Sequence, residues 1–443
     1  MGPSPSLLPA QEWPCVRHRT GMTQPYLCRP YRRSFKACYA GSAMEACLSL
    51  LPFLVLAGSI AAQKHPITVC ESSGAPAGLV AGAEFGAAVA SHGRWSVVGA
   101  PGDGVLSGQG HVYVAYYGTP VAKLQADVPA IGQRFGQAVD VFQRSVVVGA
   151  PGDGAGSVFA FEYQVGAPSR FVSLNRLTVS GTVLFGRAVA VDGDTLVVGA
   201  PDPTGGRAFV YQFAGNWQLV AELTSSLDLT NGSFGAAVDI HGSVIAVGVP
   251  GKNRVHVYER AGGVWPSTET AVLSPSDPSG PGGSMDRFGH DVAVNQGVVA
   301  VVSKFILSGG TLMRAHGYVF RSTGGWSDMS IPFTVHGGVS LFDGGDPYAI
   351  GVQDSWLVLG SAGPIDTWAP TGMYFEEAVP GTWFATELFP FDASPGDGFG
   401  ASVAIHGNRV LYGAPGFGGT GSLYAMQLPA WDQPTQPGAP AKR

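Results

Sequence analysis

The sequence predicts an all-β protein, a seven-bladed β-propeller of four-stranded antiparallel blades whose ring is closed by an N-terminal strand. Three observations predict it. Two short motifs recur about every fifty residues, the residues between them alternate as strands do, and no helical period runs through the body of the chain. Repeats of this length are typical of solenoids, propellers and arrays, and seven units of four strands favour the propeller.

The first motif is a Phe-Gly pair, and the second is a Gly-Ala-Pro triplet that follows the Phe by 14 residues. The six pairs are Phe85-Gly86, Phe135-Gly136, Phe185-Gly186, Phe234-Gly235, Phe288-Gly289 and Phe399-Gly400. The four complete triplets are Gly99-Ala100-Pro101, Gly149-Ala150-Pro151, Gly199-Ala200-Pro201 and Gly413-Ala414-Pro415. Degraded triplets stand at the same offset at Gly248-Val249-Pro250 and Val302-Ser303. Counting back from Gly360-Ser361-Ala362 to Asp346-Pro347 predicts a seventh, eroded unit.

Each unit is predicted to hold four strands. The first two are short alternating runs, such as Ala88-Val89-Ala90 and Ser96-Val97-Val98, and a tight turn at His92-Gly93 joins them, because Gly supplies the positive φ of such hairpins. The third strand alternates aromatic residues, as in His111-Val112-Tyr113-Val114. The fourth is more polar, as in the run from Trp217 to Leu223.

Closure of the ring is predicted from the two ends of the repeat array. The last unit ends after its third strand at Leu428, while the strand-like segment from Pro66 to Cys70 precedes the first Phe-Gly and has no unit of its own. We expect that segment to supply the outer strand of the last blade. A closed ring removes exposed strand edges, which otherwise promote aggregation.

The predicted propeller spans residues 63–428 and lies between two segments of another kind. Residues 1–62 are a basic stretch followed by a short apolar run and small residues, which is typical of a secretory signal peptide with cleavage near Ala62-Gln63; the start is at Met1, Met22 or Met44. An uncleaved anchor is the alternative interpretation. Residues 429–443 form a Pro-rich tail predicted to be disordered.

Removal of the leader leaves 19 Lys and Arg residues against 29 Asp and Glu residues. This acidic balance argues against nucleic acid as a partner. Only Cys70 of the five cysteines remains, and a domain of this size can bury a core that is stable without disulfides. We expect a secreted monomer without a stable membrane span, and Cys70 as a core or edge residue.

Phe-Gly followed by Gly-Ala-Pro is the signature of the FG-GAP repeat, and the chain resembles the FG-GAP propeller family over roughly residues 65 to 428. The best known member is the seven-bladed head of integrin α subunits. The chain looks most similar to bacterial secreted FG-GAP repeat proteins. This resemblance implies a non-catalytic extracellular binding or adhesion module that presents loops to a protein or a glycan.

The chain departs from the integrin pattern at its hairpin turns, which lack the DxDxDG calcium loops of that family. Calcium takes six to eight oxygen ligands, and turns such as His241-Gly242-Ser243 cannot supply them. We therefore expect no cofactor. Asp103, Asp153 and Asp202 follow the triplets at equivalent positions, where Asp is a common turn former. A weak cation or ligand site at these three residues is the less favoured interpretation.

The alternative function is a secreted hydrolase or lyase with a site in the propeller channel. No catalytic motif supports it, and an enzyme needs several ionisable groups in one pocket although only 13% of the residues are charged. We predict no catalytic residues. His92, His241 and His406 recur at one repeat position, and we interpret them as turn residues on separate blades rather than as a histidine ring.

Aromatic residues divide into two groups. Trp217, Trp265, Trp326 and Trp383 recur before the outer strands and are predicted to pack between blades. Trp368 falls outside this pattern, in the predicted loop from Gly363 to Gly372. Loops on a rigid scaffold carry function more often than the scaffold does. Trp368 and Lys304, with its predicted loop from Lys304 to Ala315, are therefore the candidates for ligand binding.

Overall fold

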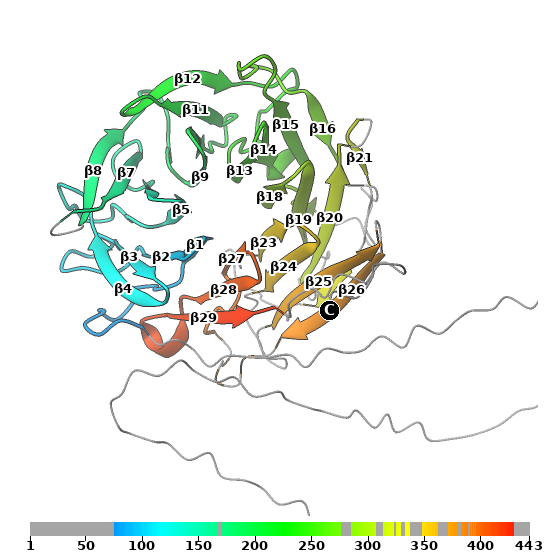
Figure 1. Ribbon diagram of the computed structural model, residues 1–443. Coiled ribbons are helices and arrows are strands. Elements are labelled where there is room, and N and C mark those ends of the chain that lie inside the picture. The colour runs from blue at the N-terminus through cyan, green and yellow to red at the C-terminus, as the bar shows by residue number, and fades with distance from the viewer. Residues whose placement is uncertain are drawn as a thin grey trace, which may run out of the picture.

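The computed structural model describes residues 75–428 except 167–169, 276–284, 307–312, 323–324, 329–332, 337–347, 362–370, 380–381, 389, 391, 393 and 395. These residues form seven antiparallel sheets arranged as a ring around a central channel (Figure 1). The prediction of a seven-bladed, all-β propeller is confirmed. The leader, Cys70, the predicted closing strand and the C-terminal tail lie outside the described residues.

In blades 1 to 4 the strands follow the chain from the channel outward. Blade 1 consists of β1 (Ala88–His92), β2 (Trp95–Ala100), β3 (His111–Tyr116) and β4 (Thr119–Leu124). Blade 2 consists of β5 (Ala138–Phe142), β6 (Ser145–Ala150), β7 (Ser157–Gln164) and β8 (Arg170–Leu177). Blade 3 consists of β9 (Ala188–Asp192), β10 (Thr195–Ala200), β11 (Arg207–Phe213) and β12 (Trp217–Leu223). Blade 4 consists of β13 (Val238–His241), β14 (Val244–Val249), β15 (Arg254–Glu259) and β16 (Ala271–Leu273).

Blades 5 to 7 depart from this regularity. Blade 5 consists of β17 (Met285–Asp286), β18 (Asp291–Asn295), β19 (Val298–Ile306), β20 (Met313–Arg321), β21 (Ser327–Asp328) and β22 (Phe333–His336). Blade 6 consists of β23 (Tyr348–Gln353), β24 (Trp356–Ser361), β25 (Thr371–Val379) and β26 (Thr382–Leu388), which confirms the eroded unit. Blade 7 consists of β27 (Ser402–His406), β28 (Arg409–Ala414) and β29 (Ser422–Gln427). The two 3₁₀ helices are η1 (Pro250–Lys252) and η2 (Phe417–Gly419).

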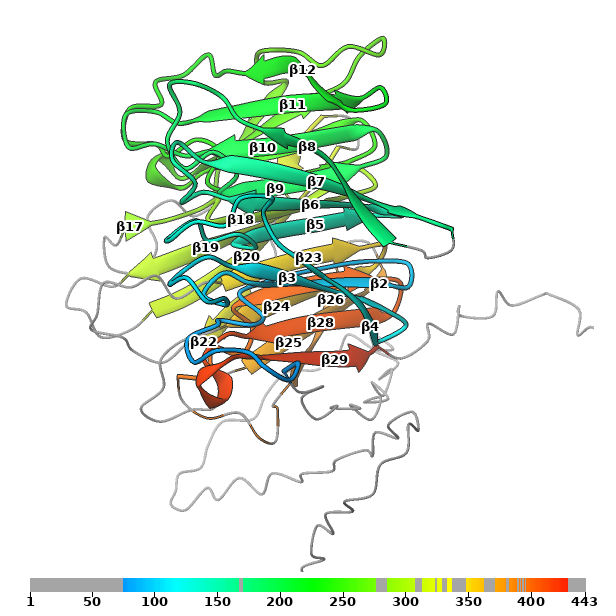
Figure 2. The same ribbon diagram turned by 90° about the vertical axis from the view of Figure 1, so that its left-hand side faces the viewer.

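The core of the ring lies between blades. Strands such as β2 and β10 are buried along their whole length, which explains why the second strand of each unit is a run of Val and Leu rather than an alternating one. Their side chains join those of the neighbouring blade in shared apolar clusters. Seen from the side, the strands of successive blades lie one above another (Figure 2).

The fourteen-residue offset between the motifs has a physical cause. In blade 2 the amide of Gly136 donates to the carbonyl of Gly149 at 3.0 Å, so the two glycines of one unit are neighbours. Gly149 also contacts the next blade, because a Cβ built on it would lie 2.0 Å from the carbonyl oxygen of Gly186. The triplet glycine of one blade must therefore lack a side chain so that the Phe-Gly segment of the next can approach.

The same contact closes the ring. A Cβ on Gly413 of blade 7 would lie 1.9 Å from the carbonyl oxygen of Gly86 in blade 1, and Ser402 donates its hydroxyl to that oxygen at 2.8 Å. Phe85 forms a bridge with Gly421, as Phe185 does with its preceding blade. Blades 1 and 7 accordingly lie side by side in Figure 1. Within the described residues, closure uses ordinary inter-blade contacts, and blade 7 has three strands.

Candidate functional site

The central channel is lined by the seven innermost strands, β1, β5, β9, β13, β18, β23 and β27, and encloses about 390 Å³ (Figure 1). Five aspartates line it: Asp192 and Asp354 at the hairpin ends of their strands, and Asp140, Asp239 and Asp291 farther along the innermost strands. Our sequence analysis did not single out the last three, which we call the channel carboxylates. Each of these three occupies a position at which most other units carry a small or apolar residue, and that exception is the signal that could have found them.

These carboxylates join neighbouring blades. Asp140 accepts a hydrogen bond from the Val191 amide of blade 3 at 2.7 Å, and Asp291 accepts one from the Ile350 amide of blade 6 at 2.9 Å. Asp239 bonds the Val294 amide of blade 5 in the same way. In each case the donor lies one repeat position beyond the acceptor. We call a bond from a backbone amide of one blade to a side-chain acceptor of the preceding blade an inter-blade acceptor bond. It satisfies backbone donors on strands that have no partner strand on the channel side.

A second ring of inter-blade acceptor bonds lies at the hairpin end of the channel. There the last residue of an innermost strand accepts a bond from the turn amide of the next blade. The pairs are Gln143 to His92 Nδ1 at 3.1 Å, Gly242 to Asp192 at 2.6 Å, Gln296 to His241 Nδ1 at 3.2 Å, Asp354 to Asn295 at 3.0 Å and Gly407 to Gln353 at 2.8 Å.

The channel carboxylates have unusual acidity. Burial raises the pKa of Asp140 to about 7, against the effect of the Val191 and Val141 amides, and burial likewise raises the pKa of Asp291 to about 7. For Asp239 burial and then the charge of Asp140 keep the pKa well above its usual value. The side chains are partly exposed, but only to the narrow channel, so the cost of desolvation dominates.

The three histidines lie beside hairpin turns on separate blades, as interpreted from the sequence, but two of them also meet. His92 and His406 come from blades 1 and 7, and their ring centroids lie 4.5 Å apart. Burial, followed by the proximity of His406, lowers the pKa of His92, and burial lowers that of His406. His241 lies apart from them in blade 4. Two of the three rings therefore meet because closure of the ring makes the first and last units neighbours.

Among the described residues the ring of turn bonds is interrupted at two interfaces: between blades 7 and 1, where His406 packs against His92, and between blades 2 and 3. Phe142 stands where the other units carry His, Asp, Asn or Gln, and it has no acceptor atom. Gly193 holds the turn position opposite it, and its amide has no acceptor among the residues that the structure describes. A hollow of about 640 Å³ opens at this point, lined by Trp95, Phe142, Gln143, Arg144, Ser145, Glu162 and Gly193.

Aromatic packing holds one wall of this hollow. Trp95 lies 4.7 Å from Tyr116, 5.0 Å from Tyr163 and 5.7 Å from Phe171, measured between ring centroids. Phe142 packs against His92 at 4.5 Å. On the other side, Arg144 is exposed and Glu162 is half-buried, and neither forms an ion pair within the described part of the chain. A packed aromatic surface therefore adjoins two charged side chains that form no ion pair in the described part of the chain.

Asp103, Asp153 and Asp202 are each engaged within their own part of the ring. Asp103 is buried and bonds Tyr113 at 2.7 Å and Lys123 at 3.0 Å; burial would raise its pKa, but these bonds hold the pKa below the usual value. Asp153 bonds an arginine of β8 at 2.6 Å, and Asp202 caps its own turn. No cluster of three potential metal ligands occurs among the described residues.

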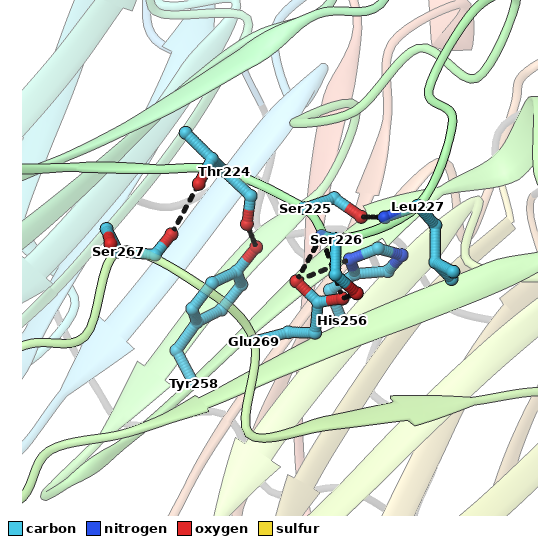
Figure 3. A network of polar contacts seen from close by, with 8 residues as sticks. All are labelled: Thr224, Ser225, Ser226, Leu227, His256, Tyr258, Ser267 and Glu269. Atoms are coloured by element: carbon cyan, nitrogen blue, oxygen red, sulfur yellow. Dashed lines mark hydrogen bonds and ion pairs between the residues drawn. The ribbon is translucent and has the colours of Figure 1, made fainter.

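A polar network joins blades 3 and 4 at their outer edge (Figure 3). Glu269 accepts bonds from the amide and hydroxyl of Ser226, and Tyr258 donates to the Thr224 carbonyl at 2.5 Å. His256 is 1% exposed, and its Nδ1 lies 3.9 Å from Glu269. Burial lowers the pKa of His256 to about 4. Glu269 lies between Ser226 and His256, so the imidazole is not placed to take a proton from the hydroxyl.

The remaining predicted sites are placed as follows. Trp217 and Trp265 are buried, and Trp326 and Trp383 pack on clusters shared by adjacent blades, which agrees with inter-blade packing. The two ends of the segment predicted as a loop from Lys304 to Ala315 are instead paired strand, because Lys304 lies in β19 directly opposite Ala315 in β20; residues 307–312 lie outside the described residues. Alternating backbone bonds extend this hairpin past the usual triplet position. Trp368 lies outside the described residues.

Comparison with known proteins gives a family model that matches two segments of the chain and solved structures of low similarity. The family model described as FG-GAP repeat matches residues 119–161 and 384–426. The WD40 domain of Toxoplasma gondii coronin is 11% identical with a TM-score of 0.47, covering 82% of this chain and 84% of that one. The Cps50 (Swd1) propeller domain of Myceliophteria thermophila is 9% identical with a TM-score of 0.46, covering 77% and 96%.

A search of curated proteins found no match. Among the described residues, no helix has the length and apolar character needed to cross a membrane. The repeated glycine contacts explain the motif spacing on which the family model depends. The two segments that match the FG-GAP repeat model agree with the recurring motifs and with the ring of seven blades, which is consistent with an FG-GAP propeller.

Proposed function

We propose that the protein is a secreted, non-catalytic propeller that acts as an extracellular binding or adhesion module for a protein or a glycan. One observation carries this proposal: the hollow between blades 1, 2 and 3 combines a packed aromatic wall with polar groups that have no partner among the described residues. Concave sites with an apolar lining and a few convergent polar groups are the usual places for ligands.

The state of the channel carboxylates supports a non-catalytic role. Asp140 and Asp239 each accept two backbone amide bonds, one from the residue that follows and one from the next blade. Their oxygens are thus engaged in holding the ring together. A general acid or base needs an oxygen free to reach a substrate.

Secretion is proposed from the leader at residues 1–62, and the competing proposal is that this segment remains as an anchor. We further propose that the module is a monomer that needs no cofactor, since Asp103 and Asp153 are already paired with cationic side chains. A calcium requirement would have to displace these ion pairs.

A binding screen of the full-length protein against arrays of glycans and extracellular proteins tests the proposal, run with calcium and with a chelator. We expect at least one ligand whose binding survives the chelator. Binding that the chelator abolishes would overturn the cofactor-free proposal. A complete lack of ligands on both arrays would overturn the binding function itself.

A hydrolase or lyase in the channel is the second candidate, and a specific observation favours it. The pKa values of Asp140 and Asp291 lie at about 7, a range that suits a catalytic acid or base near neutral pH. Turnover of a polysaccharide or peptide panel that Asp140→Asn and Asp291→Asn both remove, with folding intact by circular dichroism, would establish this candidate in place of the first.

A further inference from the structure

We propose that the hollow between blades 1, 2 and 3 is a subsite for one sugar ring of a neutral glycan. This inference depends on the proposed binding function and names the ligand of its site. The hollow measures about 640 Å³, which lies inside the range of roughly 300–1,000 Å³ typical of small-molecule pockets.

The aromatic wall suits the apolar face of a sugar ring chiefly through the half-buried Phe142, because Trp95 is only 9% exposed. Trp95 is wedged among Tyr116, Tyr163 and Phe171, so it needs no reordering when a ligand arrives. Phe142 extends this wall toward the channel mouth. A rigid aromatic residue contributes contact area at a low cost in conformational entropy, which favours binding of a flat C–H surface.

The polar groups of the hollow suit hydroxyls rather than charges. Arg144 and Glu162 have opposite charges, so their sum is close to zero and neither an acidic nor a basic ligand is favoured. The guanidinium of Arg144 is planar and offers several donors, and the carboxylate of Glu162 is planar and offers several acceptors. Gln143 adds a side-chain amide that can both donate and accept hydrogen bonds. Adjacent hydroxyls of a sugar present donors and acceptors at similar spacing.

One departure from the repeat pattern, Phe142, accounts for an apolar part and a polar part of the site. Phe142 stands where five other units carry the residue that accepts a bond from the next turn, and the amide of Gly193, a residue that lines the hollow, has no protein acceptor in the described chain. The same Phe142 ring supplies apolar surface. A ligand hydroxyl can accept the bond from Gly193 that a side chain accepts at five other interfaces.

Titration calorimetry of the full-length protein with methyl glycosides of glucose, galactose, mannose and N-acetylglucosamine, followed by oligosaccharides of the best binder, tests the assignment. We expect one neutral glycoside to bind, and Arg144→Ala and Glu162→Gln each to weaken binding by about tenfold or more, since each removes charge-assisted hydrogen bonds.

Arg94→Ala is the matched control, because Arg94 holds the turn position of blade 1 that Arg144 holds in blade 2, and it stacks on Tyr117 outside the hollow. Its affinity should equal that of the wild type. Glycan binding unchanged in Arg144→Ala and Glu162→Gln would place the glycan elsewhere and overturn the inference. Binding of proteins but of no glycan would also overturn it, yet leave the proposed function intact.

Preferential binding of methyl glucuronide over methyl glucoside would contradict the neutral character of the ligand. Binding to acidic peptides in place of sugars would do the same. Each variant should keep the thermal unfolding temperature of the wild type within a few degrees, because Arg144 is exposed and Glu162 has no bonded partner in the described residues.

Discussion

The interface between blades 5 and 6 is built differently from the six others in the ring. At the six, a triplet glycine lies against the Phe-Gly segment of the following blade, with its would-be Cβ 1.9 to 2.2 Å from a carbonyl oxygen. Between blades 5 and 6 the triplet position is Val302, and the facing Phe-Gly position is occupied by Asp346-Pro347 in the sequence. The triplet glycine and the Phe-Gly pair that form the regular contact are thus both missing from the sequence at this interface.

Polar side-chain contacts join blades 5 and 6, where the glycine contact is missing. Asp291 and Asn295 of blade 5 accept amide bonds from Ile350 and Asp354 of blade 6, and the Gln296 amide group donates to the Asp354 carboxylate at 3.0 Å. Farther out, an ion pair joins the two blades through Arg321 and Glu377. These two blades are therefore joined by side-chain contacts without the close glycine packing of the other interfaces.

The comparison shows that the element repeated around the ring is the interface between two blades rather than the blade itself. In the sequence, blade 5 lacks its triplet and blade 6 lacks its Phe-Gly, which suggests two damaged units. In the structure, the missing triplet of blade 5 and the missing Phe-Gly pair of blade 6 belong to the same interface, the one between these two blades. Blade 6 keeps Gly360, and Gly360 makes the usual contact with Gly400 of blade 7.

Placing a methyl group in a regular interface should produce the largest effect. Gly149→Ala puts a Cβ 2.0 Å from the Gly186 oxygen, which forces the blades apart, and we expect the free energy of unfolding to fall by about 3 kcal/mol in urea titrations. Val302→Gly should also destabilise, through a cavity, since Val302 is 1% exposed. A regular interface would then require glycine at the triplet position, and the interface between blades 5 and 6 would require a larger side chain there.

Gly93→Ala is the control for Gly149→Ala. Gly93 has a φ of 59° and open space around its Cβ position, so the substitution costs only backbone strain of about 1 kcal/mol. Equal losses for the two variants would contradict the close-contact explanation of the motif.

The pH dependence of stability should reveal the channel carboxylates. The native pKa of about 7 for Asp140 and Asp291 lies above the unfolded value near 3.9, so the folded state binds more protons between these limits. The contribution of these two groups to stability is fully present below about pH 4 and is lost as the pH rises through 7, by on the order of 4 kcal/mol for each group.

Asp291→Asn and Asp140→Asn should each flatten this dependence between pH 4 and 8, as measured by chemical unfolding. Because the blade 5–6 interface has no glycine contact, Asp291→Ala should destabilise the protein more than Asp140→Ala at pH 5. The reverse order would refute the view that polar bonds replace the glycine contact.

His256→Phe should stabilise the protein by restoring the regular pattern. His256 stands at the third-strand position occupied in other blades by Tyr113, Phe159, Phe209, Tyr318 and Tyr424. Its native pKa of about 4 lies below the unfolded 6.5, so wild-type stability falls as the pH drops from 6.5 to 4, by on the order of 2–3 kcal/mol. Thermal unfolding at pH 7 and pH 4.5 should show this acid loss reduced in the variant.

The smallest effect is expected from Phe142→His, which introduces the missing acceptor between blades 2 and 3. A bond from the Gly193 amide should add about 1 kcal/mol at pH 8 and less at pH 5, where the new imidazole is protonated and cannot accept. Hydrogen exchange of the Gly193 amide reports the bond directly. An exchange rate equal to that of the wild type would show that the turn positions are not equivalent.

The repeat architecture could be predicted because its cause is local in sequence: the glycines of one unit are bonded to each other, as in Gly136 and Gly149. The site could not be predicted, because it depends on relations between units. The bond from Gly193 is missing owing to Phe142, one blade earlier, and His92 meets His406 only through closure. Lys304 was assigned to a loop since the triplet was absent, whereas backbone pairing extends β19 instead.

The closing contact between blades 7 and 1 is chemically the same as the others but spans a far longer loop. Ser402 and the Gly86 oxygen are 316 residues apart, about six times the 50 to 59 residues that separate the partners of the bonds between consecutive blades. By the logarithmic law of loop closure, forming that contact from an open chain costs about 2 kcal/mol more in entropy. The seam between the first and last blades should therefore form last in folding and open first in local unfolding.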